Sequence, residues 1–246
     1  MEPFQSRGRL VAGVSFDIPG MGYRDAVTGE ISGFEVGIAR AVGAKLLGSA
    51  DRVELVQVED RGRIAALDSG RVDMVVSQLT ITPDRAEQVD FSIPYYTTRE
   101  GILVPAGSSI TTFDDLAGKR IAVTDGSISL RRMTAALPSL PGATLVLTPL
   151  SVGNLAAIEA GAADAASNDM INLTMLRMGS GRADDFTIID IGDRFDPKPF
   201  GIAVKKGSAG FVALLNAAVG ELIADGTIQT LLDEALASLH KPDTPA

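Results

Sequence analysis

The chain alternates between short apolar runs rich in valine and isoleucine and longer segments in which apolar residues recur every three or four positions. The first pattern predicts buried strands and the second predicts amphipathic helices. In the N-terminal part the strands are expected at 10–14, 53–58 and 72–76, and the helices at 34–47 and 61–69. This order predicts parallel strands whose sheet is covered by helices.

A second unit of the same kind follows, after a short helical turn at 114–118. Its expected strands are 120–124, 144–147, 163–166 and 186–191, and its expected helices are 127–136, 152–160 and 170–178. Both units therefore predict the α/β fold class.

Two extended runs of similar character, 101–104 and 200–204, bracket the second unit, and a helical pattern at 211–232 ends the chain. We therefore expect one domain inserted into another. Lobe 1 would comprise 1–103 plus 202–246, and lobe 2 would comprise 104–201. Because a ligand of parallel α/β units binds outside the carboxyl ends of the strands, we expect a ligand cleft between the lobes.

Composition excludes several classes of function. The 246 residues include 22 Lys and Arg against 31 Asp and Glu, a formal charge of −9, which disfavours nucleic acid or an anionic membrane as partner. The sequence has no cysteine and a single histidine, His240. Disulfides, thiolate nucleophiles and cysteine zinc sites are thereby excluded, and we expect neither a metal nor a cofactor.

The N-terminal residues 1–5 are polar and show no export signal, which leaves a cytoplasmic protein or a sequence that begins after a removed signal. Residues 241–246 are expected to form a frayed end.

The segment 77–85 after the third strand holds the richest set of polar groups. Thr82 followed by Pro83 is typical of a helix N-cap with proline in the first turn. Arg85 lies one turn further and Thr80 supplies a hydroxyl, so the segment resembles a receptor for a small carboxylate. The alternative is an ordinary turn, a cap and a surface arginine.

Asp169 follows a strand of the second unit and precedes a predicted helix. It is either the N-cap of that helix or a carboxylate that pairs with a ligand ammonium. The loop 126–129 offers N–H groups and hydroxyls to an anion, although such turns are common. After the first strand, Phe16 and Tyr23 either cover the aliphatic part of a ligand or pack on the lobe surface.

In its ordered motifs the chain resembles the extracytoplasmic substrate-binding proteins of polar amino-acid ABC transporters. The segments that carry this resemblance are 33–39, 69–77, 79–85, 89–96, 115–119 and 200–204. The resemblance implies a type II periplasmic-binding-protein fold, with two α/β lobes joined by two hinge strands and closing on one amino acid.

The same resemblance implies roles for particular residues. Arg85 would clamp the ligand α-carboxylate, assisted by the Thr80 hydroxyl and the main chain near Gln78. Main-chain N–H groups of Ser127 and Ile128 would complete this clamp. Asp169 would take the α-ammonium group.

Some positions depart from the family pattern. Ile128 replaces a small polar residue, Arg99-Glu100 replaces Gly-Gln, and Asp60-Arg61 occupies the place of the aromatic or leucine lid. The segment 16–30 resembles the glutamate-binding branch. Arg24, Arg61 and Arg99 are extra cations for an acidic side chain, or else surface arginines, and we favour an acidic or amide amino acid.

We therefore expect a monomeric, non-enzymatic binding protein of the periplasm or cell exterior, with or without a lipid anchor. Its partners would be a free amino acid and the membrane permease of an ABC importer. One alternative is the sensing domain of a membrane receptor. Another is a dehydratase acting on prephenate or arogenate, for which Asp169 is the sole evident proton donor.

Overall fold

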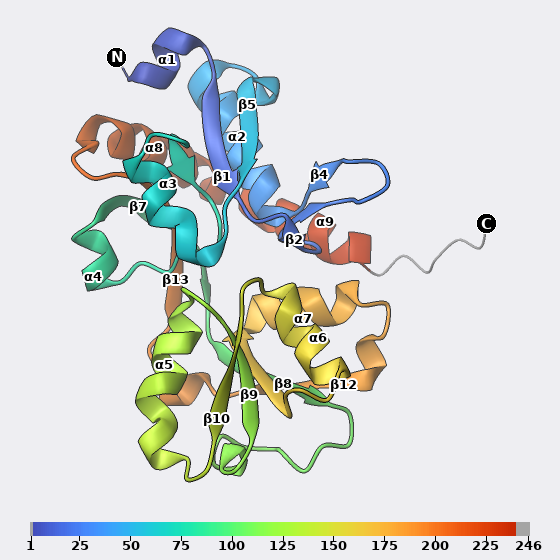
Figure 1. Ribbon diagram of the computed structural model, residues 1–246. Coiled ribbons are helices and arrows are strands. Elements are labelled where there is room, and N and C mark those ends of the chain that lie inside the picture. The colour runs from blue at the N-terminus through green and yellow to red at the C-terminus, as the bar shows by residue number, and fades with distance from the viewer. Residues whose placement is uncertain (1, 240–246) are drawn as a thin grey trace. The chain divides into compact units, whose positions relative to one another are not determined.

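The computed structural model describes residues 2–239, and the chain divides into two compact units (Figure 1). Unit 1 consists of Met1–Phe16, Gly20–Thr97 and Pro199–Ala246, and unit 2 consists of Asp17–Pro19 and Thr98–Lys198. The division falls a few residues before each of the lobe boundaries expected from sequence. His240 and the expected frayed end, 241–246, lie outside the described residues.

Unit 1 is built on a five-stranded sheet with the order β5-β1-β6-β13-β7. Strand β1 pairs in parallel with both β5 and β6, as predicted, whereas β13 runs antiparallel to β6. The sequence pattern did not indicate β7, because its buried positions do not alternate regularly. The strands are β1 (Leu10–Val14), β5 (Val53–Gln57), β6 (Met74–Val75), β7 (Val89–Thr98) and β13 (Lys198–Lys205).

Helix α2 (Phe34–Leu47) has the predicted bounds and packs on β1 and β5. The predicted helix at 211–232 is instead two helices, α8 (Ala209–Ala224) and α9 (Thr227–Leu239), because Gly226 between them has a left-handed backbone, φ 79°. The remaining elements of unit 1 are α1 (Pro3–Arg7), α3 (Arg63–Asp68), α4 (Pro83–Ala86) and the antiparallel pair β3 (Gly22–Arg24) and β4 (Ile31–Ser32). Tight 3-10 turns at Ala50–Arg52 and Asp60–Gly62 precede β5 and α3.

Unit 2 has a sheet of the same kind, with the order β10-β9-β11-β8-β12. Strand β9 is parallel to β10 and β11, and β8 is antiparallel to β11 and β12. Helices and further strands of this unit are β2 (Asp17–Ile18), α5 (Ile128–Ala136), α6 (Val152–Glu159) and α7 (Met170–Gly179). The sheet strands are β8 (Glu100–Pro105), β9 (Arg120–Thr124), β10 (Thr144–Thr148), β11 (Ala165–Asp169) and β12 (Phe186–Asp190), with 3-10 turns at Asp114–Leu116, Leu137–Ser139, Ala183–Asp185 and Gly192–Arg194.

Successive apolar side chains of β9 point to opposite faces of the sheet, and helices cover both of these faces (Figure 1). Ile121 and Val123 pack in one apolar cluster with Met133 of α5. Ala122 lies in another cluster with Leu155 of α6 and Leu173 of α7. Because successive strand residues point to opposite faces, both faces of β9 are buried.

Two strands differ from the sequence prediction in ways that bear on function. The strand expected at 72–76 is reduced to β6, and beyond it the backbone takes a left-handed conformation at Gln78. The strand expected at 163–166 starts later and continues to Asp169, so that Asp169 is its last residue.

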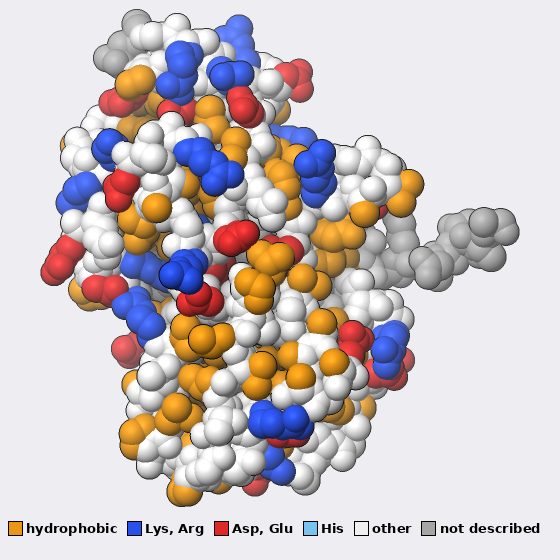
Figure 2. Space-filling view, viewed as in Figure 1, with side chains coloured by type: hydrophobic (Ala, Val, Ile, Leu, Met, Phe, Trp, Pro, Cys, Tyr) orange, Lys and Arg blue, Asp and Glu red, His pale blue; other side chains and the backbone are white. Residues whose placement is uncertain are grey.

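Charged side chains of both signs are interspersed over the face seen in Figure 2. Among residues 2–239, no single helix is long and apolar enough to cross a membrane, although α8 and α9, bent by 68°, pass that test as a pair. Within the same residues no group of three or more acidic, histidine or cysteine side chains is arranged to hold a metal ion.

Candidate functional site

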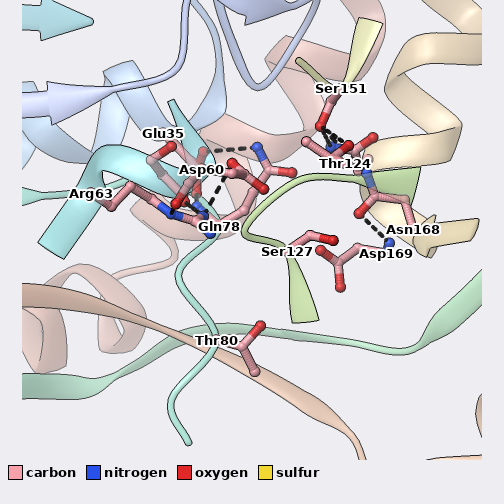
Figure 3. Close-up of polar contacts among 12 residues, drawn as sticks. Glu35, Asp60, Arg63, Gln78, Thr80, Thr124, Ser127, Ser151, Asn168 and Asp169 are labelled. Atoms are coloured by element: carbon pink, nitrogen blue, oxygen red, sulfur yellow. Dashed lines mark hydrogen bonds and ion pairs between the residues drawn. The ribbon is translucent and has the colours of Figure 1, made fainter. Parts of the chain in front are cut away.

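In unit 1, a buried polar segment follows β6. Ser77, Gln78 and Thr80 are all buried, and the main chain on either side of Thr80 pairs with β13: the Ile81 N–H donates to Pro199 and the Gly201 N–H donates to Leu79. Among the described residues, the hydroxyl groups of Ser77 and Thr80 are buried without a hydrogen-bond partner, and the Thr80 side chain is drawn in Figure 3. A buried hydroxyl that lacks a partner is costly, so these groups are suited to a ligand.

Arg85 and Thr80 are brought together by the one-turn helix α4. Thr82 is its N-cap with extended backbone and Pro83 occupies its first turn, as predicted, although the Thr82 side chain makes no capping bond. Arg85 is 6% exposed, and its Nη1 donates to the Thr80 carbonyl oxygen at 3.0 Å. A helix of four residues carries little dipole, so the anion-binding feature of this segment is the guanidinium.

The peptide group between Ser77 and Gln78 contacts two buried charged side chains. The Gln78 N–H donates to Glu35 Oε1 at 2.6 Å, and Arg63 Nη1 donates to the Ser77 carbonyl oxygen at 2.6 Å. Glu35 also accepts a hydrogen bond from the Tyr95 hydroxyl. Figure 3 shows Glu35, Arg63 and Gln78 in this cluster.

Burial raises the pKa of Glu35 to about 7, even though the hydrogen bonds from Tyr95 and Gln78 and the charge of Arg63 oppose that rise. Burial, followed by the charge of Glu35, raises the pKa of Tyr95 well above its usual value.

In unit 2, Asp169 ends β11 and is the N-cap residue of α7, but its side chain makes no capping hydrogen bond. Its Oδ1 instead lies 2.9 Å from the ammonium nitrogen of Lys198. The same nitrogen lies 2.6 Å from Glu100 Oε2 and donates to Ser129 Oγ at 2.8 Å. Lys198 and Glu100 are fully buried, and Arg132 adds a second cation 3.4 Å from Glu100.

Ser127 is the N-cap of α5, and its side chain accepts the Leu130 N–H at 3.0 Å. Its own N–H, which the resemblance assigns to the ligand, donates here to the Thr124 carbonyl oxygen at 3.2 Å. Ile128 opens the helix and is half-buried.

The other candidates are dispersed within their units. Phe16 and Tyr23 are half-buried, and Arg24 and Arg61 are exposed. Arg99 is exposed and forms ion pairs with Asp190 and Asp193 of its own unit. The ligand roles of these five residues stay predictions.

The sequence analysis did not single out Glu35, Arg63 or Lys198. Glu35 lies beside the apolar stripe of a predicted helix, and Arg63 begins another, so each resembled a solvated helix charge. Glu100 and Lys198 begin β8 and β13 but lie outside the runs 101–104 and 200–204, so their opposite charges were not compared.

Comparisons with known proteins agree over nearly the whole chain. The profile of the bacterial extracellular solute-binding proteins, family 3, matches residues 10–237. The ABC transporter glutamine-binding protein GlnH of Bacillus subtilis is 30% identical over 220 residues, which are 89% of this chain and 77% of that protein.

Two solved structures are similar in fold. The cysteine-binding protein of Campylobacter jejuni aligns with a TM-score of 0.86 at 27% identity, covering 98% of this chain and 94% of the other. The ancestral amino-acid-binding protein AncCDT-1, described as a precursor of cyclohexadienyl dehydratase, aligns with a TM-score of 0.80 at 30% identity, covering 95% and 97%.

Proposed function

Because the chain belongs to the bacterial extracellular solute-binding proteins, family 3, we propose that it binds a free polar L-amino acid and delivers it to an ABC importer. An acidic or amide amino acid is the favoured ligand. The similarity to a glutamine-binding protein of an ABC transporter supports the class of ligand. The similarity to a cysteine-binding protein leaves the side chain of the ligand open.

The observation that carries the proposal is the polar segment of unit 1. Arg85 offers a planar, permanently charged donor pair, and Thr80 and Ser77 offer buried hydroxyls that lack a partner among residues 2–239. Donors of this kind, held out of bulk water, bind a carboxylate more strongly than they bind water. The ligand α-carboxylate is therefore assigned to Arg85, Thr80 and the main chain of Gln78.

The ligand α-ammonium is assigned to Asp169. Lys198 contacts its Oδ1, while Glu100 shares that lysine. With Arg132 3.4 Å from Glu100, the two acids and two cations of this cluster sum to zero, so the assignment rests on the direct attraction between the Asp169 carboxylate and an ammonium group and not on a net charge. Ser127 and Ile128 belong to the same unit and would contribute main-chain contacts.

This function requires binding and release without a chemical step. A dehydratase would need a carboxylic acid as proton donor, whereas Asp169 lies 2.9 Å from the ammonium nitrogen of Lys198, and a cation at that distance favours a carboxylate over a carboxylic acid. The similarity to a dehydratase precursor keeps that activity as a second candidate, which an assay for phenylpyruvate or phenylalanine formation tests directly.

The partner and location follow from the family. We propose a monomer that acts outside the cytoplasm, with or without a lipid anchor, and docks on a membrane permease. A sensing domain of a membrane receptor would use the same lobes, and the genes that neighbour this one distinguish the two roles.

The first test removes the guanidinium group of Arg85. Arg85→Ala should raise the dissociation constant for the amino acid that binds best by roughly 100-fold or more, since a desolvated charged contact is lost. Isothermal titration calorimetry measures this value after a thermal-shift screen of the proteinogenic amino acids and L-cystine. Arg9→Ala is the control, because Arg9 is exposed and pairs with Glu54. Near-normal affinity in folded Arg85→Ala would remove the carboxylate clamp.

The second test concerns the ammonium group. Asp169→Ala should weaken an amino acid far more than its analogue without the amine, for example L-glutamate compared with glutarate. Calorimetric titration of both ligands gives the comparison. Equal losses for the two ligands would contradict the role of Asp169.

A further inference from the structure

Two buried charges of opposite sign bind the two polar ends of one peptide group. Glu35 in the first turn of α2 accepts the Gln78 N–H, and Arg63 at the start of α3 donates to the Ser77 carbonyl oxygen, each at 2.6 Å. Glu35 is fully buried and Arg63 is 2% exposed. A peptide bonded to a carboxylate on one side and a guanidinium on the other is held in one orientation.

This orientation coincides with an uncommon backbone conformation. Gln78 has φ 46°, and it is the one residue other than glycine with positive φ in the part of the chain that the structure describes. A residue with a Cβ atom disfavours this region, so the conformation needs compensation from its surroundings. The hydrogen bond that Glu35 accepts from Gln78 and the one that Arg63 donates to Ser77 supply that compensation.

The turn at Gln78 determines where the next residues lie. Beyond it, the main chain at Leu79 and Ile81 pairs with β13, and Thr80 between them receives the hydrogen bond from Arg85. A change in the Ser77–Gln78 peptide would therefore displace both the Gln78 main chain and the Thr80 hydroxyl.

We propose that Glu35 and Arg63 are positioning residues of the amino-acid site, which fix the Ser77–Gln78 peptide and thereby place Gln78 and Thr80 for the ligand carboxylate. The inference rests on the proposed function for the identity of the ligand. Neither residue touches the ligand. A charge pair that only stabilised the core would affect unfolding without a separate effect on affinity.

The hydrogen bond to Glu35 is tested without any ligand, by NMR of the wild-type protein and two variants. In wild type the Gln78 amide proton should be shifted downfield and protected from exchange, because it donates to a buried carboxylate. Glu35→Gln keeps an acceptor oxygen there and should retain most of the protection, whereas Glu35→Met should lose it. A rapidly exchanging Gln78 amide in wild type would overturn the inference.

The effect on binding is tested with the amino acid selected by the thermal-shift screen. Glu35→Met should raise the dissociation constant roughly tenfold or more, and Glu35→Gln by less than about threefold. Tyr95→Phe is the matched control, since it removes the other donor to the same oxygen and leaves Gln78 bonded. It should lower thermal stability and change affinity less than about twofold. Equal changes of affinity in Tyr95→Phe and Glu35→Met would show a merely structural role.

Rescue gives an independent readout, because glycine adopts positive φ without strain. Combining Gln78→Gly with Glu35→Met should reduce the affinity loss caused by Glu35→Met. An undiminished loss of affinity in the Gln78→Gly background would contradict positioning through Gln78.

If Glu35→Met does not fold, the same comparison is made with Arg63→Met, which removes the hydrogen bond to the Ser77 carbonyl oxygen. If the wild-type protein bound no amino acid, the proposed function would be refuted. The NMR experiment on the Gln78 amide needs no ligand, so it would still test the hydrogen bond to Glu35.

Discussion

At the level of single residues, the ammonium group of Lys198 has a complete set of close partners. It is fully buried and lies within 3 Å of Glu100, Asp169 and Ser129. An ammonium has three N–H donors, so these three acceptors account for all of them. Removing one acceptor leaves a buried cation that is incompletely compensated, which costs more than the intact pair contributes.

Glu100→Gln should therefore lower the free energy of unfolding by about 3 kcal/mol, although the side chain keeps its shape. Adding Lys198→Met should produce a double variant that is more stable than the sum of the single losses predicts, by about 1 kcal/mol or more. Urea unfolding of the four proteins measures this coupling. Strict additivity would mean that the ion pair makes no energetic contribution.

At the scale of elements, the start of α2 is determined by close backbone approach. Gly33, its N-cap residue, has φ 126°, and a Cβ atom there would lie 2.5 Å from the Met21 carbonyl oxygen. The first helical N–H groups donate to the carbonyls of Gly20 and Met21. Because Glu35 lies in this turn, the geometry of the cap also places the carboxylate that binds Gln78.

Gly33→Ala should destabilise the protein by about 3 kcal/mol, since unfavourable backbone conformation and steric overlap add together. It should also weaken amino-acid binding, because the first turn of α2 shifts. Gly48→Ala at the other end of the helix is the control: its φ is 79°, but a Cβ atom there meets nothing within 4 Å. That variant should lose about 1 kcal/mol and keep its affinity. Thermal unfolding and calorimetric titration separate the two effects.

At the scale of the whole molecule, Glu35 connects folding stability to pH. Its pKa of about 7 in the folded protein exceeds the ordinary value of 4.5, so the folded state binds this proton more tightly than the unfolded state does. The resulting stability is fully present below pH 4.5 and is lost as the pH rises through about 7. The loss amounts to about 3 kcal/mol.

Glu35→Gln should remove this dependence, so the difference in unfolding free energy between wild type and variant should change by about that amount from pH 4.5 to pH 8. The Arg63 guanidinium also faces the carboxylate, as does Tyr95, whose raised pKa keeps its hydroxyl protonated throughout this range. Asp164, whose pKa the Arg120 guanidinium lowers to about 2, contributes in the opposite sense and only below about pH 4. Chemical unfolding at several pH values measures the difference, and parallel curves for the two proteins would contradict the assignment.

The elements with strong local patterns were determined by the sequence alone. The bounds of β1, α2 and β9 agree with prediction, because apolar periodicity and the glycine that ends α2 act within a few residues. The same local chemistry placed Pro83 and Arg85 in one short helix with Thr82 as its N-cap. The ordered motifs also indicated the family, which the match over residues 10–237 confirms.

Only the tertiary structure decided which charges are buried and what they contact. Glu35 and Arg63 come from different helices and meet at one peptide, and Lys198 meets Glu100 from the far end of the second unit's sequence. Such contacts depend on how strands and helices pack, and a single sequence records no trace of them at either position. The left-handed conformation of Gln78 was hidden for the same reason, since its own residue type does not favour it and its stabilising partners lie elsewhere in the chain.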